Sequence, residues 1–108
     1  MDEREADERY ARLLTALVDA RDLLERAGEA RWAQWLARVE TEVRAHDAHG
    51  LRRLRGAFGG TGSLNDLVLT PVNGHTVAPD EVHAVNRTLM GLLDAAYGDA
   101  SALLRDLR

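Results

Sequence analysis

The sequence predicts an all-α protein that resembles a four-helix bundle. We expect a helical hairpin, a short third helix, a structured glycine-rich loop with a short capped helix, and one long C-terminal helix. Three observations predict this fold. Apolar residues recur every three or four positions through most of the chain. Glycines are concentrated in one stretch, residues 52–76. The 108 residues, 45% of them hydrophobic, suit a single domain spanning residues 1–108.

The first helix is expected over residues 3–27. Its apolar face consists of Tyr10, Leu13, Leu14, Leu17 and Leu24. Acidic residues suit the positive end of the helix dipole, and Gly28 is a natural stop. Arg21 falls inside the apolar stripe. Either its aliphatic stem packs while its head reaches water, or its guanidinium pairs with a carboxylate or with a backbone carbonyl of the loop region.

The second helix is expected over residues 29–46. Its apolar face is the most regular in the chain and consists of Trp32, Trp35, Leu36, Val39 and Val43. Because both tryptophans fall on this face, we interpret them as core residues. The connection at Gly28 is short, so the first two helices should form an antiparallel hairpin.

A short third helix is expected over residues 50–58. Its apolar residues are Leu51, Leu54 and Phe58. Arg52, Arg53 and Arg55 surround them and form the only local basic cluster in the sequence.

Residues 59–78 form the expected glycine-rich connection. Its glycines allow positive φ angles and close backbone approach. Ser63, followed three residues later by Asp66, has the form of a capping box and predicts a short helix near residues 64–69. Asn73-Gly74 is a tight-turn signal, so a small hairpin pairing residues 70–72 with 75–77 is an alternative.

The last helix is expected over residues 79–107. Pro79 and the two acids after it suit a first helical turn, and the apolar stripe then continues without a change of phase. A break near Gly98 is the main alternative. Asn86 lies in the middle of the apolar stripe, and we interpret it as a buried amide that hydrogen-bonds the backbone of the glycine loop.

The composition excludes several classes of site. With no cysteine, the chain cannot form disulfides or thiolate sites. All 14 basic residues are arginine, so there is no lysine for a Walker-type phosphate loop or a Schiff base. The net charge of −4 argues against nucleic acid as a partner. The acidic N-terminus and the lack of a long apolar run argue against a signal peptide and a membrane, and we expect a cytoplasmic protein. The arginine- and alanine-rich composition suggests a bacterial source.

The glycine-rich loop is the first candidate site for a ligand or partner. Successive backbone N–H groups in such a loop can bind an anion, with an arginine as counter-charge. A purely structural role as a tight connection is the alternative. The candidate residues are Gly59, Gly60, Gly62, Ser63, Asn65, Asp66, Arg55, His75 and Asn86.

A metal site is a weaker candidate. Asp80 and His83 are three residues apart, so they share a helix face, and His75 could approach them across the turn. Three such ligands and a water would make a hydrolytic site. No stronger ligand motif reinforces the pair, so we expect no metal, no cofactor and no catalytic residue.

The stretch AFGGTGSLNDLVL, together with the Asn-x-x-Leu turn from Asn86 to Leu89, resembles a family of small uncharacterised bacterial proteins. In that family a signature of the form Ala-Phe-Gly-Gly-x-Gly-Ser-x-Asn-Asp follows a helical hairpin. The resemblance covers about residues 13–107. It implies an all-helical fold and no established activity.

The leading functional hypothesis is a non-enzymatic protein-interaction module of the immunity, adaptor or regulatory type, with another protein as its partner. The competing hypothesis is a small ligand-binding or metal-dependent enzyme with its site at residues 59–66, His75 and His83. A third hypothesis is a homodimer formed through the long helix.

Overall fold

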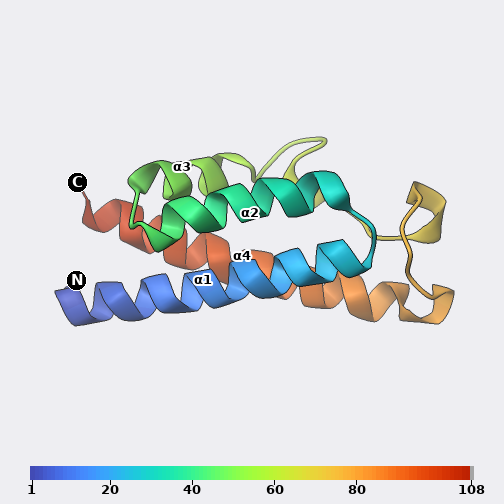
Figure 1. The fold of residues 1–108 in the computed structure, drawn as a ribbon, viewed down its shortest axis with the longest axis horizontal. Coiled ribbons are helices and arrows are strands. Elements are labelled where there is room, and N and C mark those ends of the chain that lie inside the picture. The colour runs from blue at the N-terminus through green and yellow to red at the C-terminus, as the bar shows by residue number, and fades with distance from the viewer. Residues whose placement is uncertain (108) are drawn as a thin grey trace.

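The structure is a computed structural model that describes residues 1–107. Within this range it contains helices and no strand (Figure 1). The elements are α1 (Glu3–Arg26), α2 (Ala30–Arg44), α3 (Ala48–Gly56), η1 (Leu64–Asp66), η2 (Pro71–Asn73), η3 (Pro79–Glu81) and α4 (Val82–Asp106), where η marks a single turn of 3₁₀-helix. The predicted all-α fold with a long C-terminal helix is confirmed.

The four α-helices pack as a closed ring. Helices α1 and α2 form an antiparallel hairpin, α3 packs against α2 and α4, and α4 returns along α1. Both termini therefore lie at the same end of the bundle (Figure 1), where the amino group of Met1 is 3.3 Å from a carboxylate oxygen of Asp106. None of the helices within residues 1–107 has the length and apolar character needed to cross a membrane.

The core is built almost entirely from aliphatic residues at the predicted spacings. The fully buried leucines and valines are Leu13, Leu17, Leu24, Leu36, Val39, Val43, Leu51, Leu54, Leu64, Leu69, Leu89 and Leu93. Two of them, Leu64 and Leu69, come from the connection between α3 and α4, so this connection contributes to the core. Trp32 and Trp35 pack edge to face at the margin of the core and remain only partly buried.

Several element boundaries differ from the expected ones for local reasons. Helix α3 begins at Ala48 rather than at residue 50, because the Asp47 carboxylate accepts a hydrogen bond from the His49 amide at 2.9 Å and caps it. Helix α4 begins at Val82, after the 3₁₀ turn η3 that follows the fixed φ of Pro79. It then continues through Gly98 without a break.

The short helix expected near residues 64–69 begins at Leu64 as predicted, but it ends at Asp66 as the single turn η1. The chain becomes extended at Leu67, where φ is −69° and ψ is 131°. The helix does not continue here because both backbone groups of Leu69 are bound by a side chain of α4. The alternative of a small hairpin is wrong, because Pro71–Asn73 form the turn η2 instead. The amides of Asn73 and His75 both donate to the Thr70 carbonyl, at 3.0 and 3.1 Å, so no ladder between two strands forms.

Arg21 lies between the first two helices and pairs with Glu40 of α2, which is buried with 7% of its side chain exposed. The Arg21 Nε donates to Glu40 Oε2, and its Nη1 donates to Glu25 Oε1 at 3.0 Å. Hydrogen bonds to Glu40 and then to Glu25 raise the pKa of the Arg21 guanidinium above its usual value. The guanidinium therefore pairs with a carboxylate, as one of the two alternatives predicted. This carboxylate belongs to α2 and not to the loop region.

This ion pair gives the first testable prediction. Replacing Arg21 by Met leaves the Glu40 carboxylate buried without its cation, and should lower the free energy of unfolding by on the order of 3 kcal/mol. The double variant Arg21→Met/Glu40→Met should recover most of this loss, because no unpaired charge remains. Urea unfolding followed by tryptophan fluorescence measures both. The control is Arg38→Met, at an exposed position of α2. Equal midpoints for the single and double variants would contradict the prediction.

Candidate functional site: the glycine loop

The glycine loop, residues 59–62, is the exposed part of the connection that leaves α3. Figure 1 shows it projecting above α2, between α3 and the far end of the bundle. The buried Leu64 lies just after it, and the Leu64 amide donates to the Ala57 carbonyl at 2.8 Å. The loop is therefore closed at its base by a backbone hydrogen bond and anchored by a core side chain.

Three glycines in the loop have positive φ angles: +90° for Gly59, +94° for Gly60 and +80° for Gly62. A Cβ atom built on any of them would meet no atom within 4 Å. The glycines are thus needed for the backbone conformation and not for close packing. This conformation, rather than contact with the core, gives the loop its shape.

The side chains of η1 fold back and hydrogen-bond the loop. Asn65 Oδ1 accepts from the Gly59 amide at 2.9 Å, and Asp66 Oδ2 accepts from the Gly62 amide at 3.0 Å. The Ser63 hydroxyl lies 2.6 Å from the Gly60 carbonyl oxygen and 2.7 Å from Asn65 Oδ1. Ser63 makes no side-chain capping bond to η1, so the predicted capping box does not form. Its hydroxyl instead faces the loop that precedes it.

These bonds bear directly on anion binding. An anion-binding nest needs backbone N–H groups that point at the ligand. Here the Asp66 carboxylate already accepts from one loop amide and the Asn65 amide oxygen accepts from another. The loop therefore carries its own internal carboxylate in the place where a phosphate-binding loop would receive its ligand.

The arginines of α3 do not supply a counter-charge to the loop. Arg55 and Arg52 line a shallow hollow of about 270 Å³ together with Leu104 and Leu107 of the C-terminal end of α4. Arg53 pairs with Glu42 of α2, with its Nε 2.8 Å from the carboxylate. The structure thus separates Arg55 from the other loop candidates.

Asn86 of α4 holds the second half of the connection. Its Oδ1 accepts from the Leu69 amide at 2.7 Å, and its Nδ2 donates to the Leu69 carbonyl at 2.8 Å. As predicted, the Asn86 amide therefore binds the backbone of the connection. Its partner is Leu69, beyond η1, and not one of the loop glycines.

His75 joins the connection to the turn between α1 and α2. Its Nδ1 accepts from the Thr70 amide at 3.2 Å, which places the ring proton on Nε2, and Nε2 donates to Glu29 Oε1 at 3.1 Å. The same Glu29 carboxylate caps α2 by accepting from the Trp32 amide at 3.3 Å. Glu29 carries no sequence signal for this role, because its partner His75 is distant in sequence.

The weak candidates for metal ligands are not brought together. Asp80 in η3 and His83 in the first turn of α4 are exposed, whereas His75 has only 7% of its side chain exposed and is already bonded on both ring nitrogens. Among the residues that the structure describes, no group of three or more His, Cys, Asp or Glu side chains is placed to hold a metal ion. The polar candidate residues are thus divided between four places: the loop, Leu69, the α1–α2 turn and the exposed surface around the start of α4.

One exposed apolar residue was not singled out from the sequence. Val72, at the tip of η2, has 92% of its surface exposed. The turn below it is fixed, because Asn73 Nδ2 donates to the Val68 carbonyl at 3.1 Å and the Gly74 amide donates to Pro71 at 2.9 Å. Val72 is therefore held out from the end of the bundle on a defined backbone.

The second testable prediction concerns Asn86. In Asn86→Leu the partly buried N–H and C=O groups of Leu69 lose their hydrogen-bond partner. This loss should lower the free energy of unfolding by about 2–3 kcal/mol. Asn73→Leu is the matched control, since it removes an exposed hydrogen bond and should change stability by less than about 1 kcal/mol. Chemical denaturation gives both values. Similar losses in the two variants would show that Asn86 has no special role.

The third prediction separates backbone strain from packing in the loop. Gly60→Ala forces an L side chain to φ near +94°, and should lower the free energy of unfolding by roughly 1–2 kcal/mol. The control Gly56→Ala makes the same change within α3, where φ is not positive and a Cβ also meets no atom within 4 Å. It should be neutral or stabilising by up to about 1 kcal/mol. If thermal unfolding showed Gly60→Ala to be at least as stable as the wild type, the loop would not need its glycine.

Comparison with known proteins supplies a family but no activity. A family model described as a domain of unknown function, DUF6966, matches residues 25–78. This segment contains α2, α3, the glycine loop, Leu69 and His75. Comparisons with curated proteins and with solved structures gave no match. Because the family model spans half of the chain, the chain belongs to the family of proteins that contain this domain, DUF6966.

Proposed function

We propose that the protein is a non-enzymatic protein-interaction module and that the glycine loop is its contact surface. The observation that carries the proposal is a loop that is both exposed and fixed. Residues 59–62 add no side chain to the core, yet Asn65 and Asp66 bind their amides. A preorganised loop loses little conformational entropy when a partner binds, which favours affinity.

The side chains that could act as a nucleophile or a general base already have hydrogen-bond partners within the protein, which supports the same proposal. The Ser63 hydroxyl and the Asp66 carboxylate bond the loop backbone, and His75 bonds Thr70 and Glu29. A nucleophile or general base needs a free lone pair directed at the reacting group. These groups are instead committed to holding the fold, which favours an interaction role of the immunity, adaptor or regulatory type.

Val72 offers a further anchor for a protein partner. An aliphatic side chain held out on a fixed turn can fill a pocket on another protein and remove its apolar surface from water there. The partner in this proposal is another protein, not a nucleic acid, which agrees with a net charge of −4. A bacterial source, a cytoplasmic location and a glycine-loop signature shared across the family belong to the same proposal.

The fourth prediction tests the contact surface. A photocrosslinking amino acid at Thr61, in the loop, should capture one protein from an extract of the native host, whereas the same amino acid at the exposed Thr41 of α2 should not. With the captured protein purified, Thr61→Arg should weaken binding at least about tenfold, or about 1.4 kcal/mol. Calorimetry measures this change, with Thr41→Arg as the control.

Two results would contradict the proposal. One is equal capture from positions 61 and 41, which would show that the loop is not the contact surface. The other is a rise in melting temperature with a metal ion, a nucleotide or a phosphate in a thermal-shift screen, if Asn65→Ala or His75→Phe abolished it. That result would favour the small ligand-binding or metal-dependent enzyme instead.

A further inference from the structure

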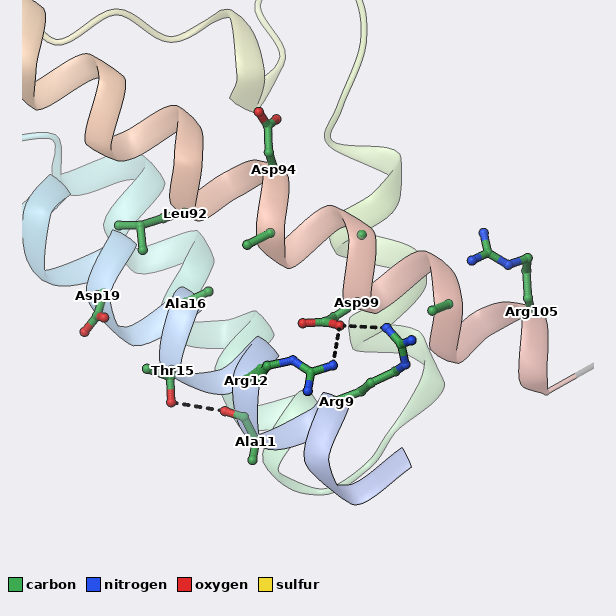
Figure 2. Close-up of a pocket in the computed structure, with 13 residues that line it drawn as sticks. Arg9, Ala11, Arg12, Thr15, Ala16, Asp19, Leu92, Asp94, Asp99 and Arg105 are labelled. Atoms are coloured by element: carbon green, nitrogen blue, oxygen red, sulfur yellow. Dashed lines mark hydrogen bonds and ion pairs between the residues drawn. The ribbon is translucent and has the colours of Figure 1, made fainter. Parts of the chain in front are cut away.

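A surface groove of about 790 Å³ runs between α1 and α4 (Figure 2). Its apolar lining is mostly small, with Ala11 and Ala16 from α1 and Ala95, Gly98 and Ala102 from α4. A Cβ atom at Gly98 would meet no atom within 4 Å, so the bundle itself does not need glycine there. Without a side chain, Gly98 leaves the middle of the groove open to another molecule.

Positively and negatively charged residues of the rims lie at opposite ends of this groove. Arg12 on the α1 rim and Arg105 on the α4 rim mark the end near the chain termini (Figure 2). Asp19 on the α1 rim and Asp94 on the α4 rim mark the other end. Arg12 and Asp19 are separated by two helical turns, about 10 Å along the axis. Each rim therefore changes from basic to acidic along the groove.

At the basic end, two arginines of α1 converge on one carboxylate of α4. Arg9 Nη1 and Arg12 Nη2 both donate to the same oxygen of Asp99, Oδ1, at 3.0 and 3.3 Å (Figure 2). Within the described part of the chain, the buried Nε of Arg9 has no hydrogen-bond partner. Arg9 also has the Glu5 carboxylate 3.5 Å from its Nη2. Among the described residues, Arg12 therefore has only its share of Asp99, and its side chain, 57% exposed, can accept a further carboxylate as partner.

We propose that this groove face binds a second copy of the same chain, turned end for end. The two copies are related by a two-fold axis that lies in the interface, perpendicular to the groove. This axis places α1 antiparallel to the α1 of the second copy, and α4 antiparallel to its α4. The basic end of each groove then faces the acidic end of the other. A two-fold axis along the groove would place like charges together, so the charge pattern selects the first arrangement.

The size of the face suits a stable dimer. The bundle is 45 Å long, and two adjacent helices are about 20 Å wide, so the α1–α4 face offers about 900 Å². A standard interface buries about 800 Å² on each partner. Small residues in the middle of the face let the helices of the two copies approach closely. This self-association does not depend on the glycine loop, which lies outside the groove lining.

The fifth prediction is a dimer that is broken by filling the groove. Sedimentation equilibrium of the full chain should show a reversible dimer that weakens as salt screens the charges. Gly98→Leu places a bulky side chain in the groove and should raise the dimer dissociation constant at least tenfold. The matched control is Gly91→Leu, also in α4, also exposed and without an atom within 4 Å of its Cβ, but outside the groove lining. It should leave the constant within about twofold of the wild type.

A charge-swap experiment tests whether these charges form the interface and guards against misfolding. Asp19→Arg/Asp94→Arg makes both ends of the groove basic, and Arg12→Glu/Arg105→Glu makes the rims acidic throughout. Each double variant should be a monomer by itself, because every pairing then brings like charges together. An equimolar mixture of the two should restore a dimer that contains one copy of each.

Several results would overturn the proposed dimer. A wild type that stays monomeric up to about 0.5 mM would overturn the proposal, as would a dimer that Gly98→Leu leaves intact. Failure of the two charge variants to associate, while circular dichroism shows both to be helical, would also overturn it. A monomer that instead binds a foreign helix through Gly98 would assign the groove to a different occupant and reject self-association.

Discussion

The structure depends on the pairing of Asn86 with the backbone of Leu69. The chain must travel from the end of α3 to the far end of the bundle before α4 can begin, and it does so without a strand or a long helix. Backbone groups in such a segment need partners, and one amide on α4 supplies both for Leu69. The Leu69 side chain is then fully buried. The connection is thereby held against the long helix, and the exposed loop on one side of it and the Val72 turn on the other acquire fixed positions.

The polar residues of the connection act mainly on one another and on the neighbouring turn. Asn65 and Asp66 hold the glycine loop, while His75 and Glu29 join η2 to the start of α2. Each of these groups looks chemically useful in the sequence, and each already has a partner in the fold. What they leave exposed is the backbone of the glycine loop and the side chain of Val72, the two features on which the proposed interaction rests. The α1–α4 groove is a separate surface, distinguished by the order of its charges.

The fold could be predicted largely from the sequence, whereas the candidate site could be predicted only in part. The stripes that place Leu13, Leu36 and Leu89 in the core are local patterns, so periodicity suffices to find the helices. Asn86 stood out because an amide inside an apolar stripe needs a partner. The identity of that partner, and those of Arg21 and His75, could not be read from spacing. Glu40 and Glu29 each lie more than two helical turns away in sequence, and only packing of the helices brings them close.

The sequence by itself determined four helices, the positions of the glycines and the need to satisfy Asn86, because these follow from side-chain periodicity and backbone sterics within a few residues. Tertiary structure decided the rest. It shortened the expected helix near residues 64–69 to one turn, because the backbone N–H and C=O of Leu69 pair with Asn86 and not with a helix. It also turned the side chains of Asn65 and Asp66 onto the loop amides, so that a stretch resembling an anion-binding loop became a rigid, self-satisfied one.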